Sequence, residues 1–365
     1  MIDDLNDDFW PGTERIIESF LDRQRTRMTD AGLGDYYDDV RAMIDNPTGK
    51  HFCSWFVYWG WRAAGGSGPA QLQNLQTTAA SIEMLHAALL LQDDVLDGSD
   101  YRRGQPAVRK VCANRHAAHG WYGDAAQFGD GCAIALSTIA QDWSTQLLRT
   151  LPDTPSIQRA MEIFHDRTVV TECGQLLELV TRADRDYTIE RALRINQYKN
   201  GAYMFAPTMR MGAAIANAGE RVHEAFHSAG LLLGEGHQSR NDLHGAFGDS
   251  RTQPTGGFDD LTEGKPSLLL SYAIQDADAD QHATLLELYG KPHLTPAQAQ
   301  RIRALLEATG ARTKTEEFIS TRFAEACAIL RSAPITAAGY AGLTELARRA
   351  LYHTTKIGAR HVQEK

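Results

Sequence analysis

The sequence lacks the features that mark membrane, secreted and nucleic-acid-binding proteins. No apolar run reaches 18 uninterrupted residues, so we expect no membrane-spanning helix. The N-terminal segment MIDDLNDDFWPGTER is acidic and has no apolar signal core, which disfavours secretion. Lysine and arginine total 37 against 46 aspartate and glutamate residues, a net charge of −9. The chain therefore lacks the basic excess that nucleic acids and anionic membranes attract.

Cysteine is scarce and scattered. The chain has five cysteines and no C-x-x-C pair, which argues against a zinc site or a disulfide framework. Free cysteines of this kind are typical of proteins in a reducing compartment, so we expect a cytoplasmic location.

Alternating polar and apolar residues, which would indicate strands, are also missing. Apolar residues in the segment Gln73–Val95 instead recur every three or four positions, the spacing of one buried helical stripe. Seven further segments show similar spacing: Ala133–Leu151, Ser156–Thr181, Ile189–Ala218, Arg221–Leu243, Leu268–Leu288, Pro296–Thr309 and Thr313–Leu330. No segment marks a linker between two cores. We therefore predict an all-α fold with a single domain over residues 1–365.

An acidic cluster, Asp93, Asp94 and Asp97, stands at the end of the apolar helix predicted at 73–95. Asp93 and Asp97 are four residues apart and project from one helical face. Paired carboxylates repel without a cation, and Mg²⁺ binds one or two carboxylates together with substrate phosphates. Arg102 and Arg103 come a short loop later, and guanidinium groups match phosphate oxygens. The combination predicts a diphosphate site, although the acidic cluster alone also fits a solvated helix end.

The pattern D-D-x-x-D-x-x-x-x-R-R-G-x-P resembles the first aspartate-rich motif of the trans-isoprenyl (polyprenyl) diphosphate synthases, in particular actinobacterial geranylgeranyl diphosphate synthases. Further similar motifs extend the resemblance over about residues 45–350: Gly49–His51, Glu83–His86, Gly174–Leu179, Tyr198–Tyr203, Gly234–Asp249 and Asp260–Ser267. The resemblance implies a helical bundle around a deep central cavity, and a homodimer.

The resemblance also implies the chemistry and its residues. Mg²⁺, three ions with diphosphate bound, would help an allylic prenyl diphosphate to ionise, and an acceptor would then capture the allylic cation. The implied metal ligands are Asp93, Asp97, Asn241 and Asp242. The implied allylic diphosphate ligands are Arg102, Lys199 and Lys265, and the implied acceptor diphosphate ligands are Lys50, His86 and Arg103; Gln238 is a further implied diphosphate ligand. Asp93, Asp94, Asp97, Lys199 and Lys265 form the predicted catalytic set.

Two positions before the acidic cluster bear on the length of the prenyl chain. Ala88 and Leu89 are the fifth and fourth residues before Asp93, and neither is aromatic. We predict that they leave room for a long chain; the alternative is that they simply pack the core, as small aliphatic residues in helices often do.

The sequence departs from the family pattern at the acceptor site and in the second acidic motif. His51 and Cys53 stand where the family has arginines, Ser54 follows them, and Asn241 replaces an aspartate. Losing one bidentate arginine removes charge-assisted hydrogen bonds worth about 1.5–3 kcal/mol. We therefore predict that His51, Cys53 and Ser54 line a pocket for a small apolar or aromatic acceptor such as indole, with farnesyl or geranylgeranyl diphosphate as donor.

Three other functions remain open. The first is an ordinary farnesyl or geranylgeranyl diphosphate synthase that uses isopentenyl diphosphate. In that case the departures from the family pattern are neutral sequence changes without an effect on function. The second is a class I terpene cyclase, which needs only one diphosphate. The third is a non-catalytic subunit, disfavoured because Asp93, Asp94 and Asp97 are all retained.

Overall fold

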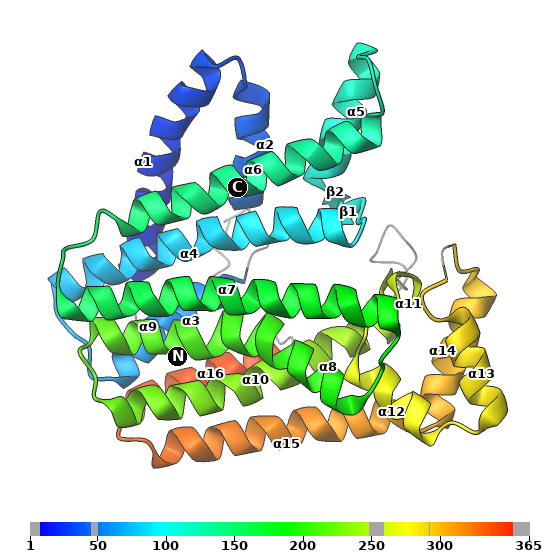
Figure 1. Ribbon diagram of the computed structural model, residues 1–365. Coiled ribbons are helices and arrows are strands. Elements are labelled where there is room, and N and C mark those ends of the chain that lie inside the picture. Colours follow the sequence, from blue (N-terminus) through cyan, green and yellow to red (C-terminus); the bar gives the residue numbers. More distant parts are fainter. Residues whose placement is uncertain (1–7, 45–49, 248–258, 292, 353–365) are drawn as a thin grey trace, which may run out of the picture. The chain divides into compact units, whose positions relative to one another are not determined.

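The computed structural model describes residues 8–44, 50–247, 259–291 and 293–352, and these are almost entirely helical (Figure 1). Within these ranges the only strands are β1 (Tyr101–Arg102) and β2 (Gln105–Pro106). The prediction of an all-α fold is confirmed. No helix in the described ranges is long and apolar enough to cross a membrane. The chain forms two compact units, described in turn; a single domain over residues 1–365 stays a prediction.

The first unit comprises residues 1–58 and 67–157 in its main part and centres on one long helix. Its elements are α1 (Phe9–Asp30), α2 (Gly34–Ile44), the start of α3 (Phe52–Ala63), α4 (Pro69–Leu96), α5 (Val108–His119) and α6 (Ala125–Leu148). Residues 77–85 of α4 are all buried, which is why this helix lies inside the unit rather than on its surface. Ser81 and Ser144 each donate a hydroxyl to the other's carbonyl oxygen, and these small residues let α4 and α6 pack closely.

A tight hairpin follows α4 and reverses the chain. Strand β1 pairs antiparallel with β2, with Arg102 opposite Gln105. The two turn residues, Arg103 and Gly104, have φ of 55° and 79°. Positive φ at both positions is the requirement of a type I′ turn, and glycine meets it without a Cβ clash.

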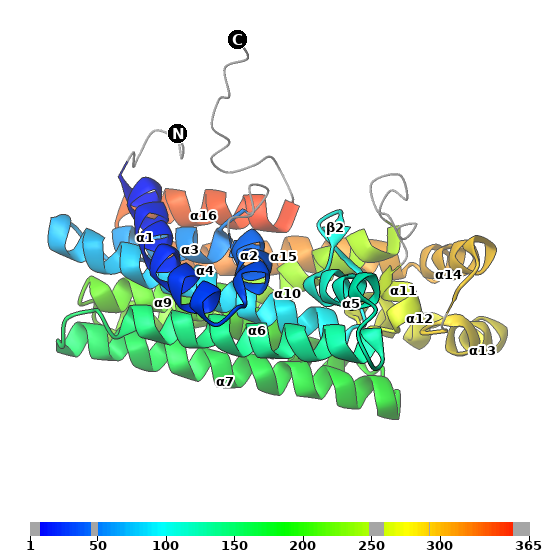
Figure 2. The same ribbon diagram turned by 90° about the horizontal axis from the view of Figure 1, so that it is seen from above.

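The second unit comprises residues 59–66 and, in the described part of the chain, 158–352. After the end of α3 it contains α7 (Pro155–Asp184), α8 (Ile189–Asn196), the π-helix η1 (Gln197–Phe205), α9 (Ala206–Ile215), α10 (Glu220–Phe247), α11 (Asp259–Glu263), α12 (Leu268–Asp276), α13 (Ala279–Leu288), α14 (Pro296–Ala308), α15 (Ala311–Ser332) and α16 (Ala337–Tyr352). Helices α13 and α14 lie side by side in both views (Figures 1 and 2).

Helix α10 packs against η1 and α9 at glycines. A Cβ at Gly230 would lie 2.3 Å from the Cα of Ala206, and one at Gly234 would lie 2.2 Å from the Cα of Gly201. No real Cβ contact is this short, so α10 can approach η1 and α9 this closely only because both positions lack a side chain.

The predicted helices differ from the observed ones in two places. The segment predicted as one helix at 189–218 is α8, η1 and α9 in succession. The segment predicted at 268–288 breaks between α12 and α13, because Asp278 begins a new helix with a capping box to Gln281. The helices that were not predicted are α1, α2, α3, α5, α11 and α16.

Candidate active site

The first acidic cluster lies at the C-terminal end of α4, with Asp97 as the residue that caps the helix. The hairpin brings Arg102 back over this end. Its guanidinium donates to Oδ2 of Asp93 at 2.8 Å and to Oδ1 of Asp94 at 2.6 Å. The structure thus pairs the acidic cluster with the first of the two arginines.

Asp94 is the most buried carboxylate of this cluster, with 1% of its side chain exposed. Burial raises the pKa of Asp94 to about 6, although Arg102 opposes the shift. The Oδ2 atom of Asp94 is buried and makes no hydrogen bond to any residue within the described ranges. A cation beside the cluster would stabilise its charged form.

The carboxylate oxygens of this cluster are the kind of ligand that Mg²⁺ prefers. Within the described residues no group of three or more histidine, cysteine, aspartate or glutamate side chains is arranged to hold a metal ion. Mg²⁺ does not need such a cage, because it binds through one or two carboxylates, water and substrate phosphates. Asp93 lies in the last turn of α4, Asp97 caps the helix, and the buried Oδ2 atom of Asp94 makes no hydrogen bond to a described residue; the role of Asp93 and Asp97 as metal ligands stays a prediction.

Lys199 lies in the second unit, within η1. Its ammonium group is 3.0 Å from Oε2 of Glu178, a buried residue of α7 that also accepts from Arg182. A Cβ at Gly174 would lie 2.7 Å from the backbone nitrogen of Lys199, so this glycine sets the approach of α7 to η1. π-Helical segments often occur at functional sites, and Lys199 lies within this one.

A chain of hydrogen bonds connects η1 with the second acidic motif on α10. Asn200 donates to Gln238 at 2.8 Å, and Gln238 donates to Oδ1 of Asp242 at 2.7 Å. Gln238 therefore fixes the orientation of the buried Asp242 carboxylate. Asn241 is half-buried beside it. Asp249, which ends the motif predicted from sequence, lies outside the described residues.

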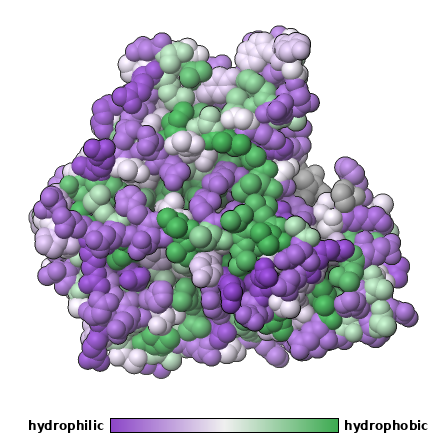
Figure 3. Space-filling model, viewed as in Figure 1, coloured by the Kyte–Doolittle hydropathy of each residue, from purple (hydrophilic) through white to green (hydrophobic). Residues whose placement is uncertain are grey.

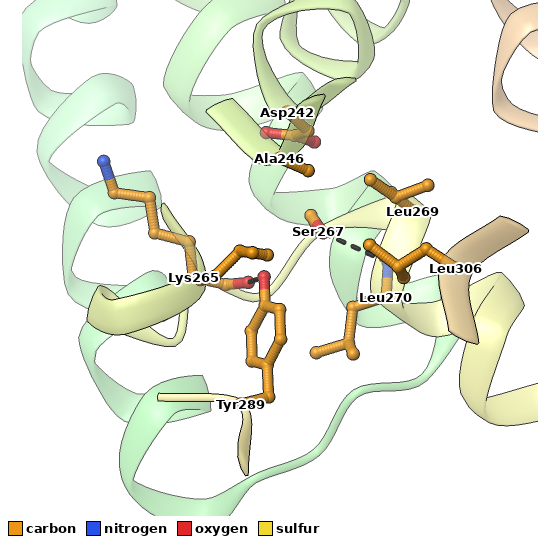
Figure 4. A pocket seen from close by; sticks show the side chains of 9 residues that line it. Asp242, Ala246, Lys265, Ser267, Leu269, Leu270, Tyr289 and Leu306 are labelled. Carbon is orange, nitrogen blue, oxygen red and sulfur yellow. Dashed lines mark hydrogen bonds between the residues drawn. The ribbon is translucent and has the colours of Figure 1, made fainter. Parts of the chain in front are cut away.

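Lys265 follows α11 and borders a small pocket in the second unit. The pocket is lined in part by Asp242, Ser267 and Tyr289 (Figure 4). Tyr289 donates its hydroxyl to the carbonyl oxygen of Lys265 at 2.8 Å, and the ammonium group lies 2.9 Å from Glu263. In Figure 4 the Lys265 side chain extends away from the leucines, and its charged end points away from the apolar part of the pocket.

The predicted acceptor residues surround a buried carboxylate. Glu83 of α4 accepts from Nδ1 of His51 at 2.9 Å and from the Ser54 hydroxyl at 2.5 Å. Cys53 is buried at the start of α3, and the half-buried Lys50 has its ammonium group 5.7 Å from the centre of the Phe52 ring. Burial lowers the pKa of Lys50. The structure brings His51 and Ser54 together on Glu83, a residue to which the sequence analysis gave no role.

The remaining predicted residues lie in the first unit. His86 is half-buried one turn beyond Glu83, and Arg103 is exposed at the hairpin tip. Ala88 is buried in the core shared by α4 and α6, and Ser137 donates to its carbonyl oxygen, whereas Leu89 is half-buried. The roles of these residues stay predictions.

Two further polar residues are part of the site, namely Glu178 and Asn200, and sequence reasoning gave neither a role of its own. Both lie in motifs that the sequence singled out, at 174–179 and 198–203. Their partners are 21 and 38 residues away along the chain, so only the fold shows what they contact.

Glu83 makes the stability of the first unit sensitive to acid. Burial alone would raise the pKa of Glu83, but the electrostatic effect of His51, its hydrogen bond, the electrostatic effect of His86 and the hydrogen bond from Ser54 together lower it from 4.5 to about 2. A lowered pKa contributes stability above pH 4.5 that is lost as the pH falls toward 2, about 3 kcal/mol for this shift. We expect the free energy of unfolding, measured with urea at several pH values, to decrease as the pH falls. The decrease is expected to be about 3 kcal/mol larger in the wild type than in Glu83→Gln. Parallel curves would show that the buried pair adds no such stability.

The structure thus combines an all-helical fold with an aspartate cluster that is paired to an arginine. The polyprenyl synthetase family model matches residues 36–308, and the chain belongs to this family. It is 26% identical to the geranylgeranyl diphosphate synthase of Mycobacterium tuberculosis over 327 residues, 89% of this chain and 87% of that protein.

Two other proteins extend the comparison. The chain is 29% identical to the octaprenyl diphosphate synthase of Escherichia coli over 248 residues, 67% of this chain and 63% of that protein. Among solved structures it resembles a geranylgeranyl pyrophosphate synthase from Corynebacterium glutamicum, complexed with isoprenyl diphosphate and magnesium. The TM-score is 0.89 and the identity 28%, with 95% of this chain and 99% of that chain covered.

Proposed function

We propose that the protein is a Mg²⁺-dependent isoprenyl diphosphate synthase, a prenyltransferase that extends an allylic prenyl diphosphate with isopentenyl diphosphate. The observation that carries the proposal is the cluster at the end of α4, where Arg102 spans Asp93 and Asp94. If Mg²⁺ binds these carboxylates in place of Arg102, the guanidinium becomes available to bind phosphate oxygens.

Each residue has a role in this reaction. Bound Mg²⁺ would neutralise the leaving diphosphate as the allylic C–O bond breaks. Asp93 and Asp97 would hold metal in the first unit, and Asn241 and Asp242 in the second. Glu178 and Glu263 keep the ammonium groups of Lys199 and Lys265 in place, where they would bind the allylic diphosphate. Neutral Asn241 is a weaker metal ligand than aspartate, so the second motif would bind metal less tightly.

Isopentenyl diphosphate is the acceptor that the comparisons support, rather than the aromatic acceptor predicted from sequence. The relatives named above are an octaprenyl and a geranylgeranyl diphosphate synthase, and nothing in the comparisons points to indole. The half-buried Lys50 and His51 also leave basic groups near the pocket, which suits a charged acceptor. The likeness to geranylgeranyl diphosphate synthases favours a geranylgeranyl product made from a farnesyl donor.

The experiment is an assay of purified protein with Mg²⁺ and geranyl, farnesyl or geranylgeranyl diphosphate. Each donor is tested alone, with isopentenyl diphosphate and with indole, and diphosphate release and product mass are followed. Longer prenyl diphosphates formed only with isopentenyl diphosphate support the proposal. Diphosphate release that depends on indole would instead support the aromatic acceptor predicted from sequence. A hydrocarbon formed from the donor alone would show that the protein is a terpene cyclase.

We propose that the protein works as a homodimer through one face of α7. Four exposed residues follow one another there at spacings of four, three and four: Val169, Cys173, Leu176 and Val180. This is the seven-residue pattern by which two helices pair. Apolar side chains also gather in the band that α7 occupies in the view of Figure 3. A second copy of the chain, with the same stripe, is the simplest cover for it.

A charge in this stripe is expected to separate the subunits. Leu176 is 62% exposed, so Leu176→Glu costs little in the monomer but would bury a charge in the dimer. Light scattering after size exclusion is expected to show a dimer for the wild type and a monomer for the variant. Glu162→Gln, an exposed position on the same helix, is the control and is expected to stay dimeric. A wild-type monomer, or an unchanged dimer in Leu176→Glu, would contradict this interface.

A further inference from the structure

A group of basic residues in the second unit lies far from the residues of the candidate active site. Arg159 is near the start of α7, Arg210 is in α9, and His223 is in the first turn of α10. At 1.5 Å of rise per residue, Arg159 is about 28 Å along α7 from Glu178. His223 is likewise about 28 Å along α10 from Asp242. We call Arg159, Arg210 and His223 the basic cluster; it is not part of the candidate active site.

His223 is buried, with 1% of its surface exposed, and its polar atoms are unsatisfied. Neither ring nitrogen makes a hydrogen bond to any residue that the structure describes. A neutral imidazole offers one N–H donor and one acceptor nitrogen, and a buried donor or acceptor without a partner costs stability. Native proteins rarely leave such groups unmatched, so a polar ligand beside this ring would supply what the protein itself does not.

Arg210 and Arg159 add positive charge close to this ring. Arg210 is half-buried, and its Nε atom is buried with no hydrogen bond to a residue of the described ranges. Burial, together with Arg159, lowers the pKa of Arg210. Burial and the positive charges of Arg159 and Arg210 lower the pKa of His223 to about 4. The three side chains are therefore within electrostatic reach of one another, and two of them present buried N–H groups.

The negative charges near the basic cluster leave these N–H groups unused. Glu220 is 2.5 Å from a guanidinium nitrogen of Arg159, and 63% of its side chain is exposed. Asp166 acts electrostatically on Arg210 from an exposed position on α7. Water and salt screen exposed carboxylates, so both compensate the buried positive charge only weakly. His227 adds an exposed imidazole one turn farther along α10.

We propose that the basic cluster binds a phosphate-type anion, either inorganic phosphate or diphosphate, at a site separate from the active site. The anion's oxygens would accept hydrogen bonds from Nε of Arg210 and from an imidazole N–H of His223, and would face the guanidinium of Arg159. Charge-assisted hydrogen bonds from guanidinium groups to phosphate oxygens are among the strongest in proteins. The N-terminus of α10 also favours negative charge at this place. The proposal goes beyond the proposed function and does not depend on it.

The site is open to an anion from solvent. Arg210 is half-buried rather than enclosed, and 36% of the Arg159 side chain is exposed. An anion can therefore contact the two guanidinium groups first and reach the buried imidazole of His223 behind them.

The test is isothermal titration calorimetry of the full chain with inorganic phosphate and, separately, with diphosphate. Mg²⁺ is left out, because the aspartates of the candidate active site need a metal ion to bind diphosphate, and sodium chloride keeps the ionic strength constant. Wild type is expected to bind a single anion per chain in a saturable way. Arg210→Gln is expected to raise the Kd by about tenfold or more, the factor that one charge-assisted hydrogen bond supplies. Arg210→Lys keeps the charge without the planar fork and is expected to lie between the two.

A second variant and a control complete the design. His223→Leu removes both ring nitrogens, and its fold is expected to survive because neither nitrogen bonds a described residue. It is also expected to raise the Kd. Arg221→Gln is the matched control, since it removes one positive charge from an exposed position in the same turn of α10. Its Kd is expected to equal that of the wild type. Phosphate is expected to raise the Tm of wild type and Arg221→Gln but not that of Arg210→Gln, because a ligand stabilises the folded state that binds it.

The outcomes decide the proposal and its ligand. Saturable binding of both anions supports a site for free phosphate, and binding of diphosphate alone supports a site for the diphosphate group. No saturable heat with either anion, or an unchanged Kd in Arg210→Gln, would overturn the site. An equal rise in Kd for Arg221→Gln would show general attraction by charge and would also overturn it. Chain elongation is expected to be normal in Arg210→Gln, and its loss would contradict a site separate from the active site.

Discussion

Replacing Asp93 by alanine is expected to lower kcat by about a thousandfold or more. Asp93 is a predicted metal ligand at the end of α4 and shares Arg102 with Asp94. A metal ion stabilises transition-state charge by several kcal/mol, and about 4 kcal/mol corresponds to a thousandfold in rate. The measurement is diphosphate release from the allylic donor at saturating Mg²⁺. Because ionisation precedes capture, the loss is expected whichever acceptor the protein uses.

The fold of Asp93→Ala is expected to survive, because Arg102 keeps its 2.6 Å contact with Asp94. Asp142→Ala, an exposed position on α6 in the same unit, is the control and is expected to keep full activity. Turnover of Asp93→Ala at more than a tenth of the wild-type rate would contradict a catalytic role for the acidic cluster.

Replacing Gly234 by alanine is expected to destabilise the second unit by at least about 3 kcal/mol, the upper end of the usual cost of overpacking. The new Cβ would lie 2.2 Å from the Cα of Gly201, a backbone atom that no side-chain rotation can move away. The adjustment must displace η1 or α10. Since Lys199 lies two residues before Gly201, activity is expected to fall with stability. Urea unfolding followed by circular dichroism gives the first quantity and the diphosphate assay the second.

Gly131→Ala on α6 is the matched control. No atom outside the local helix lies within 4 Å of the position that the new methyl group would take, and alanine is preferred to glycine in helices by up to about 1 kcal/mol. This variant is expected to be as stable as the wild type or slightly more so. If Gly234→Ala unfolded at the wild-type urea concentration, the close approach of α10 and η1 would not be the constraint that we describe.

Much of the site follows from local sequence. The i, i+4 spacing of Asp93 and Asp97 on an apolar helix, followed by Arg102, predicts a site for metal and diphosphate. The structure places the arginine on Asp93 and Asp94. The helical class follows equally from apolar spacing, because that period decides which face of each helix is buried. Such properties depend on residues close together in the chain.

The limits of the prediction lie where distant residues meet. A histidine and a cysteine in place of two arginines suggested a weakened, apolar acceptor pocket, since sequence shows the loss of charge but not its replacement. The fold adds Glu83 and Trp10, which lie 32 and 41 residues from His51 and contact it directly. The break between α12 and α13 was missed because apolar spacing continues across it, while the capping residue Asp278 decides the boundary.

The sequence by itself determined the helical class and the polyprenyl synthetase resemblance, and it supplied the carboxylates and basic residues that we predict for the site. The tertiary structure alone decided what each charge is paired with: Lys199 with Glu178, Lys265 with Glu263, and His51 with Glu83. The physical reason is that helical periodicity and motif spacing are local, whereas the pairing and burial that set a side chain's charge depend on which helices pack together.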